Sequence, residues 1–371
     1  MEIREVTTQR DLRRFIRFPG GLYAHDPLWI PPIWREESGA YSKKGNPILS
    51  NSDFVLTIAM DGDLCVGRNL TYVDNAFNAY NASNTGFFGS FECINNAMAF
   101  ETLINHSESW LRNRKIDLVR GPINPVAEHW GFLFESNGDP PIFLSPHNPT
   151  YYLDLFATRG YIKSKDLLAY DVNRNQEYEI PGRIDRFLDI LKKRKPSLSV
   201  RRIDRRHIID DAEIIWKLSN CAYAGNWGYV PVSRDVMLDL VRRLRRIMDP
   251  DAIWFVEDGG TPVGYCLGFP DINRIIREIG GRFFPFGFLK FLTLLKHIKH
   301  YRLFGLAIHP DYQGMGLDVL LYASLYRSLK PKSIRLEANY ILEDNFNIRN
   351  ALEKLGMNRI RSYRILERNL Q

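Results

Sequence analysis

A turn at residues 313–317 carries the residue types best suited to chemistry. Residues 303–308 form an apolar, strand-like run, and the sequence QGMG at 313–316 leads into apolar residues at helical spacing. A helix N-terminus offers unpaired backbone N–H groups and the positive end of the helix dipole, and glycines let the backbone approach an anion closely. The turn therefore predicts a phosphate-binding site, although glycines in such turns also serve purely structural ends.

Other kinds of site fit this sequence poorly. A P-loop is excluded because GxxxxGK[ST] is absent, and the two glycines of the turn do not make GxGxxG. The four cysteines lie far apart without a CxxC pair, so we expect no metal site and no thioredoxin-like motif. The turn at 313–317 remains the strongest candidate.

Two halves of similar plan surround this turn. Residues 54–68 and 254–268 both read as strand, Asp-Gly turn, strand. Alternating strands and helices then follow in each half, which predicts mixed sheets covered by helices. The predicted strands are 85–94, 116–123, 301–308, 333–340 and 361–367, and the predicted helices are about 97–113, 149–159, 317–329 and 345–355.

The run HPDYQGMG at 309–316 resembles the acyl-CoA-binding motif of the GNAT superfamily of N-acyltransferases, and 345–367 resembles that family's ending. Residues 26–32, 86–92, 120–125, 220–232, 270–273 and 281–287 are similar to bacterial proteins built as tandem GNAT-like halves, a group of mostly unassigned function. The resemblance implies that acetyl-CoA or a longer acyl-CoA is bound by the backbone of Leu306 and Ile308 and by Gln313, Gly314, Met315, Gly316, Leu317, Asp318 and Asn345.

The implied fold class is α/β of the α+β type, with two GNAT-like domains. Each would be a mixed, largely antiparallel twisted sheet with helices on both faces. We expect a degenerate domain at 1–172, a linker with a helix at 173–197, and an acyl-CoA-binding domain at 198–371 that carries an insertion at 274–301. The first half lacks glycines at 91–100, so we expect no CoA pyrophosphate there.

Two departures from the family pattern concern the chemistry. Asp318 stands where the loop usually has a small residue, and its carboxylate would repel a pyrophosphate unless it turns away. Leu352 stands where many members carry a tyrosine that protonates the leaving thiolate. Tyr340 is a candidate replacement, and a half-buried strand tyrosine is the alternative reading.

Acyl transfer to an amine also needs a base and an acceptor site. Glu337 alternates with apolar Ile334 and Leu336 on a predicted strand and is our candidate base; a solvated strand carboxylate is the alternative. Asn226, Trp227 and Tyr229 combine aromatic rings with polar groups, which suits an acceptor wall and plain packing equally well.

The insertion at 274–301 mixes Phe, Leu and Ile with Arg, Lys and His. It could pack into the core, or form a basic, apolar lid that holds an apolar substrate or touches an anionic membrane. The basic run at 192–206 reads as a solvated face rather than a nucleic-acid patch, since no RNP-like or helix-turn-helix pattern accompanies it.

Composition limits the class of protein. The 371 residues are 45% hydrophobic and 25% charged, which are ordinary globular values. Lys+Arg 50 against Asp+Glu 43 gives +7, too little to argue for nucleic acid alone. The first residues lack a signal-peptide core, so we expect a cytoplasmic protein whose only membrane contact would be peripheral, at the inner membrane.

Two functions follow from the sequence. The first is transfer of an acetyl or longer acyl group from acyl-CoA to a small-molecule or lipid-like amine. The second, which Asp318 and Leu352 motivate, is a non-catalytic GNAT-like module that binds CoA, a peptide or another protein.

Overall fold

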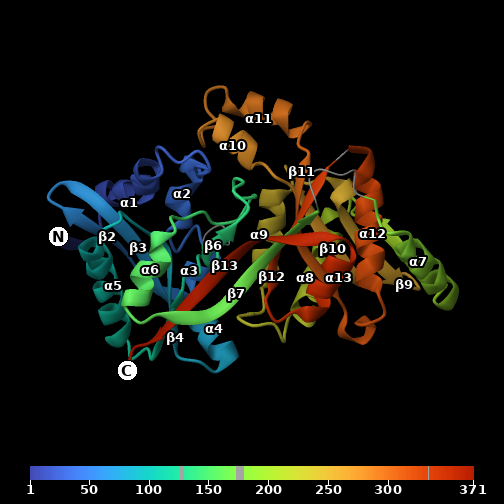
Figure 1. The fold of residues 1–371 in the computed structure, drawn as a ribbon, viewed down its shortest axis with the longest axis horizontal. Coiled ribbons are helices and arrows are strands. Elements are labelled where there is room, and N and C mark those ends of the chain that lie inside the picture. The colour runs from blue at the N-terminus through green and yellow to red at the C-terminus, as the bar shows by residue number, and fades with distance from the viewer. Residues whose placement is uncertain (126–128, 173–178, 333) are drawn as a thin grey trace. The chain divides into compact units, whose positions relative to one another are not determined.

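The computed structural model describes residues 1–125, 129–172, 179–332 and 334–371 (Figure 1). Residues 173–178 of the predicted linker and residue 333 of the predicted strand 333–340 lie outside the described residues. Two compact units make up the chain. Unit 1 comprises 1–167, 273–292 and 361–371, and unit 2 comprises 168–272 and 293–360.

Unit 1 is built on a sheet with strand order β1-β2-β3-β4-β5-β13. Neighbouring strands are antiparallel except β4 and β5, which are parallel. Its elements are β1 (Glu2–Glu5), α1 (Gln9–Leu22), α2 (Trp34–Ala40), α3 (Pro47–Ser50), β2 (Ser52–Asp61), β3 (Leu64–Asp74), α4 (Asn75–Asn81), β4 (Thr85–Cys93), α5 (Ala97–Arg112), β5 (Leu118–Gly121), β6 (Phe132–Ser136), α6 (Tyr151–Thr158) and α10 (Asn273–Glu278), with parts of β7 (Ile162–Val172), α11 (Gly287–Leu295) and β13 (Met357–Asn369).

Unit 2 repeats this plan with strand order β12-β11-β10-β9-β8. Again the neighbours are antiparallel except one parallel pair, β11 and β12. Its elements are α7 (Gly182–Arg194), β8 (Leu198–Arg202), α8 (Ile208–Ala222), α9 (Arg234–Leu244), β9 (Ile253–Asp258), β10 (Thr261–Pro270), β11 (His300–Ile308), α12 (Leu317–Leu329), β12 (Arg335–Leu342) and α13 (Phe346–Lys354). Short 3₁₀ turns cover Pro250–Ala252, Pro310–Tyr312 and Lys330–Lys332.

Helices cover both faces of each sheet, because successive strand residues face opposite sides. In unit 2, the Tyr265 hydroxyl bonds Ser219 of α8, whereas Cys266 lies under the Leu321 carbonyl of α12. In unit 1, Arg68 reaches the Phe15 carbonyl of α1, and Asn69 beside it bonds Ser107 of α5. The predicted fold class is confirmed.

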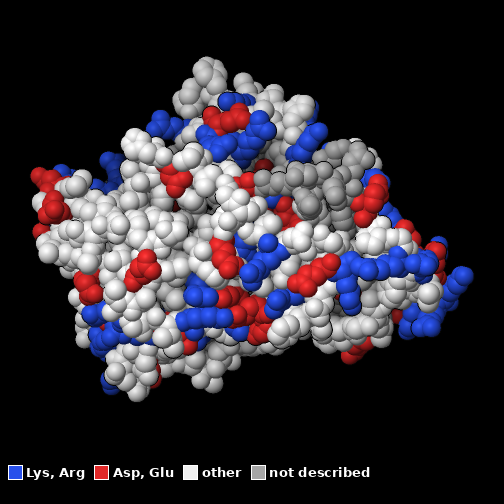
Figure 2. Space-filling view, viewed as in Figure 1, with Lys and Arg blue, Asp and Glu red and all other residues white. Residues whose placement is uncertain are grey.

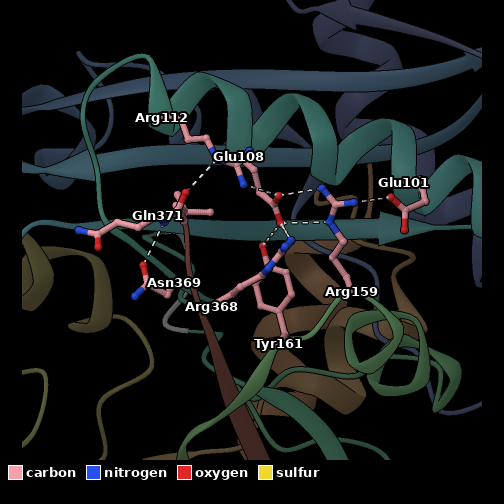
Figure 3. A network of polar contacts seen from close by, with 9 residues as sticks. Glu101, Glu108, Arg112, Arg159, Tyr161, Arg368, Asn369 and Gln371 are labelled. Carbon is pink, nitrogen blue, oxygen red and sulfur yellow. Dashed lines mark hydrogen bonds and ion pairs between the residues drawn. The ribbon is translucent and has the colours of Figure 1, made fainter.

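A buried carboxylate organises one end of unit 1 (Figure 3). Glu108 on α5 is fully buried and contacts the guanidinium groups of Arg112, Arg159 and Arg368 at 3.3, 2.9 and 2.6 Å. Burial alone would raise the pKa of Glu108, but the hydrogen bonds and charges of Arg159 and Arg368 hold it below its ordinary value. Because Arg368 lies near the end of β13, this cluster fixes that strand in unit 1.

The insertion divides between core and surface. Ile275, Ile276 and Phe291 are buried, as a core-packing segment requires. Core packing is the wrong prediction for Phe284 and Phe286, whose side chains are exposed. Apolar type alone could not separate these positions, because both kinds of phenylalanine occur within one short run.

The basic run at 192–206 consists largely of ordinary surface contacts. Lys192, Lys193 and Arg194 form the last turn of α7, where cations favour the negative end of the helix dipole. Arg201 bonds Glu257 at 2.6 Å, and Arg202 bonds Asp251 at 2.5 Å. These pairs agree with a solvated structural face.

Candidate functional site

The parallel strands β11 and β12 part midway along their length. Their register pairs run from His300 opposite Arg335 to Leu303 opposite Ala338. Within the described chain no later pair joins them, although β11 continues to Ile308 and β12 to Leu342. Beyond Leu303, this edge of β11 has no paired strand in the described residues, and the Leu306 and Ile308 carbonyls accept hydrogen bonds from side chains instead.

A β-bulge lies where the strands separate. On the β10 side, Leu267 pairs with Gly305 and Gly268 pairs with Leu303, so Phe304 is the extra residue. Bulges bend a strand and are common beside active sites. The pairing with β12 ends at this bulge, so residues 304–308 form the splayed part of the strand predicted at 303–308.

The loop after β11 presents an uncapped helix N-terminus. Gly316 is the N-cap of α12 with φ +80°, and it contributes no side-chain cap. The Gln313 amide donates to the Ile308 carbonyl at 3.2 Å, which closes the loop onto the strand. Leu317 is buried beneath the helix, whereas Gly314 and Met315 lie at the surface. The loop is thus anchored at both ends, and its helix has no side-chain cap, while the Phe187 ring packs against Gly316.

Asp318 lies in the first turn of α12, where a carboxylate favours the helix dipole. In the described residues, no backbone N–H donates to its side chain, so it is not a capping residue. Repulsion between this carboxylate and a pyrophosphate stays a prediction. Its charge acts on Tyr322, whose pKa is raised by burial and then by Asp318.

Glu337 lies immediately before the point where the strands part. Its neighbour Ala338 belongs to the core under α12, so Glu337 faces the opposite side of the sheet. Its side chain is fully buried, which makes a solvated strand carboxylate the wrong reading. The Asn339 amide donates to it at 3.3 Å, and the His300 Nε2 atom lies 3.7 Å from its second oxygen.

His300 links this buried carboxylate toward the surface. Its Nδ1 atom lies 3.4 Å from Asp271, and its side chain is about one quarter exposed (24%). The two ring nitrogens of a histidine can hold and release protons at different places. His300 thus lies between two carboxylates, although its Nε2 atom makes no hydrogen bond within the described chain.

A tyrosine hydroxyl reaches the splayed strand from the other side. Tyr223, at the end of α8, donates to the Leu306 carbonyl at 2.8 Å. The Tyr265 hydroxyl donates to Tyr223 at 3.4 Å and contacts Ser219 at 2.7 Å. Burial raises the pKa of Tyr223 well above its ordinary value, so it stays protonated. Its hydroxyl proton is shared with the Leu306 carbonyl.

These features agree with a family of known chemistry. Residues 214–357 match the family model described as acetyltransferase (GNAT) family. Residues 214–357 belong to the GNAT family. Members use acyl-CoA as co-substrate, and membership supports an N-acyltransferase activity for this chain.

Two relatives match the chain over nearly its whole length. The chain is 28% identical to Protein YghO of Escherichia coli over 99% of this chain and 95% of that protein. It is also 28% identical to a bacterial ceramide synthase of Caulobacter vibrioides, over 98% and 96% of the two chains.

Solved structures share the fold at low identity. A tandem GNAT protein of the clavulanic acid pathway matches with TM-score 0.58 and 10% identity, over 100% of this chain and 98% of that one. A probable N-acyltransferase of Enterococcus faecalis matches with TM-score 0.53 and 8% identity, over 100% of this chain and 72% of that one. The tandem GNAT arrangement predicted from the sequence is confirmed.

The other predicted site residues lie in mixed surroundings. Asn345 caps α13 by accepting from the Ile348 N–H at 3.2 Å. Tyr340 lies beyond the strand separation, with the Arg302 guanidinium 5.1 Å from its ring. Leu352 is fully buried, so the usual tyrosine position is core here.

The acceptor-wall candidates form a compact loop between α8 and α9. The Tyr229 hydroxyl bonds the side chain of Asn220, which also bonds the backbone of Val232. Asn226 is exposed and Trp227 is half-buried. This loop follows Tyr223 directly, so it lies beside the residue that touches the splayed strand.

Three residues of this candidate site escaped sequence reasoning: Asp271, His300 and Tyr223. Asp271 and Tyr223 lie within segments that already resembled the tandem group, so a signal for them was present. His300 carried none, because its place beside Glu337 depends on strand register.

The corresponding place in unit 1 is filled by the chain itself. The Asn96 side chain caps α5 by accepting from the Ala99 N–H at 3.0 Å. The Cys93 N–H donates to the Tyr152 hydroxyl at 3.0 Å, and the Cys93 carbonyl accepts from the Tyr151 hydroxyl at 2.7 Å. In unit 1, side chains thus bond the strand end and cap the helix, whereas α12 of unit 2 has no side-chain cap.

Replacing Tyr223 with Phe is expected to lower kcat about tenfold to a hundredfold, because the leaving thiolate loses its proton donor. Steady-state kinetics over a pH series would measure this, and the rate should recover in part at acid pH. Tyr301→Phe is the matched control, since its hydroxyl bonds Asp249 instead. An unchanged kcat for Tyr223→Phe would remove Tyr223 from the chemistry.

Proposed function

We propose that this protein is an acyl-CoA-dependent N-acyltransferase that acts on a lipid-like amine. The observation that carries the proposal is the parting of β11 and β12 beside the uncapped N-terminus of α12. An acyl-CoA would lay its pantetheine arm along Leu306 and Ile308 and its pyrophosphate on 313–318. Asn345, at the start of α13, would also contact the acyl-CoA.

The proposed reaction joins an amine nitrogen to the thioester carbonyl carbon and breaks the carbon–sulfur bond. Glu337 takes the proton that the amine must lose, and His300 passes it on toward solvent. The thiolate of CoA leaves with a proton from Tyr223, or from Tyr340 as the second candidate. Holding both reactants in the gap supplies much of the rate.

The acceptor class follows from the relatives and the insertion. A ceramide is the amide of a long-chain amino alcohol, and one relative of similar length is named a ceramide synthase. We propose a long-chain amine as acceptor, held by Asn226, Trp227 and Tyr229, with the insertion at 274–301 touching the inner-membrane surface. Nucleic acid has no part in this proposal.

The domain arrangement belongs to the same proposal. The GNAT-like domain at 198–371 would bind acyl-CoA, and the domain at 1–172, joined by the linker 173–197, would be degenerate. The capped α5 and the tyrosines on Cys93 support this division.

The described residues contain no group of three or more His, Cys, Asp or Glu side chains that could hold a metal ion. No helix among them is long and apolar enough to span a bilayer.

Binding is tested by thermal unfolding with acyl-CoAs from acetyl to palmitoyl. A ligand at a hundred times its Kd adds about 2.7 kcal/mol, which is a clear rise in Tm. We expect the rise in Tm to depend on the length of the acyl chain and to be largest for one range of lengths. If no acyl-CoA raises Tm, the acyl-CoA site is disproved.

Catalysis needs a separate test with long-chain amino alcohols and short amines as acceptors. We expect release of CoA thiol only with the long-chain amines, followed by detection of the amide product. A rise in Tm without turnover of any acceptor would favour the non-catalytic binding module, with Asp318 and Leu352 as its cause.

A further inference from the structure

A surface tip on unit 1 carries large apolar side chains. It consists of residues 282–292, between α10 and the middle of α11, at the top of Figure 1. Phe284 is 87% exposed and Phe286 is 75% exposed, and Phe288, Leu289 and Leu292 are exposed as well. Soluble surfaces rarely gather so many large apolar groups in one short segment.

The backbone holds these rings outward. The Phe288 N–H donates to the Phe283 carbonyl at 2.8 Å, which closes a tight loop around Pro285. A Cβ at Gly287 would lie 2.1 Å from the Arg282 carbonyl oxygen, so this loop requires glycine. Phe283 is the ring of this loop that faces inward, because it packs edge-on against the buried Phe291 ring with 5.3 Å between the ring centroids. Phe284 and Phe286 therefore cannot turn into the core.

The base of the tip is fastened to unit 1. The Trp34 N–H donates to the Gly281 carbonyl at 3.2 Å, and its indole N–H donates to the Gly280 carbonyl at 3.1 Å. The Arg277 guanidinium donates to the Pro27 carbonyl at 3.1 Å. A fixed base lets the tip enter another phase without being unfolded by it.

Basic side chains accompany the apolar ones. Residues 273–292 contain four basic residues and one acidic residue, Glu278. Arg274 and Lys290 both contact Glu278, and Arg282 is exposed. Figure 2 shows uncharged surface at the end of this segment with Lys and Arg beside it. Apolar groups with a basic surround suit an anionic lipid surface.

A hollow of about 480 Å³ lies at the base of the tip. Tyr23, Trp29, Trp34 and Arg277 are among its lining residues. Tryptophan and tyrosine favour the boundary between lipid chains and water, because one end of each ring system is polar. The hollow would therefore lie at headgroup level if the phenylalanines entered the acyl chains.

We propose that residues 282–292 dock the protein on a bilayer that contains anionic lipids. Phe284 and Phe286 insert among the acyl chains, and Arg282 and Lys290 meet the lipid phosphates. This docking rests on the membrane contact of 274–301 in the proposed function and makes it specific, but it does not need acyl transfer, since binding to a bilayer needs no reaction. It explains how a protein could meet an amphiphilic amine that resides in a membrane.

The test is co-sedimentation of the full chain with vesicles of phosphatidylcholine, with and without phosphatidylglycerol. The wild type should bind the anionic vesicles and be released by salt. Phe284→Ser with Phe286→Ser should lower partitioning at least about tenfold, because two rings no longer leave water. Leu64→Ser is the matched control, since Leu64 is 66% exposed at the start of β3 in the same unit.

Folding and acyl-CoA binding give independent readouts. The double variant should keep the Tm of the wild type and its rise with acyl-CoA, so loss of vesicle binding cannot be blamed on unfolding. The proposal is overturned if the wild type ignores both vesicle types or binds them equally. A dimer that the double variant abolishes, without vesicle binding, would assign the tip to a second copy of the chain instead.

Discussion

Replacing Glu337 with Gln is expected to lower kcat by roughly 10²- to 10⁴-fold while leaving the acyl-CoA affinity unchanged. The carboxylate is fully buried one residue before the strands part, which is where the proposed reaction takes place. Glutamine keeps the shape and the contact with Asn339 but cannot accept the proton of the amine. Steady-state kinetics with a long-chain amine, and acyl-CoA binding by thermal shift, measure the two effects separately.

Glu257→Gln serves as the control for this change. Glu257 is a largely buried carboxylate on β9 that pairs with Arg201 away from the gap. Its loss should lower stability without a comparable loss of kcat. The kcat of His300→Gln should lie between those of Glu337→Gln and Glu257→Gln, because this change interrupts the path of the proton but leaves the base in place. Equal kcat values for Glu337→Gln and the wild type would show that another group removes the proton.

Replacing Glu108 with Ala is expected to destabilise unit 1 by about 3–5 kcal/mol. The substitution leaves Arg112, Arg159 and Arg368 beside one another without the buried carboxylate that they share. Part of β13 should then detach from unit 1, since Arg368 lies on it. A fall in the urea unfolding midpoint would measure this, together with faster amide exchange in residues 361–369.

Glu101→Ala is the matched control, because Glu101 pairs with the same Arg159 at 3.1 Å but is 39% exposed. A solvent-exposed pair contributes about 0–1 kcal/mol. The pH dependence gives a second check. The lowered pKa of Glu108 means that its contribution is present at neutral pH and is lost as the pH falls through that value. A Glu108→Gln variant with the wild-type midpoint and acid sensitivity would contradict this assignment.

Periodicity was sufficient for most of the local structure. The apolar spacing at 317–329 coincides with α12, and the two Asp-Gly turns join β2 to β3 and β9 to β10. These elements depend on residues close in sequence, whose preferences the chain reveals directly. The glycine loop was found for the same reason, since its four residues are consecutive.

Strand register placed the rest of the site beyond sequence reasoning. Glu337 was recognised by its alternation with apolar neighbours, but that pattern also fits a solvated face. Only the pairing of β11 with β12 shows that it is buried, and that His300 is its neighbour. Alternation gives the face of a strand and not its partner.

The sequence also could not show which apolar residues lie at the surface. Phe284, Phe286 and Phe291 look alike in the sequence, and only the tight loop at Gly287 separates the buried ring from the exposed ones. Most large hydrophobic side chains are buried, but those of a functional surface patch are exposed. Such an exception becomes visible only with the backbone geometry.

Unit 1 contains residues 361–371 as well as 1–167, and this affects how the protein can be made. Ribosomes add about 5–20 residues per second, and domains usually fold in the order in which they emerge. Strand β5 pairs with the last segment of unit 1, for example Gly121 with Leu366. That segment is synthesised roughly 190 residues after the end of the first segment of unit 1, 1–167. The edge of β5 therefore stays exposed for roughly 10–40 s, a period in which chaperones or neighbouring chains can pair with it.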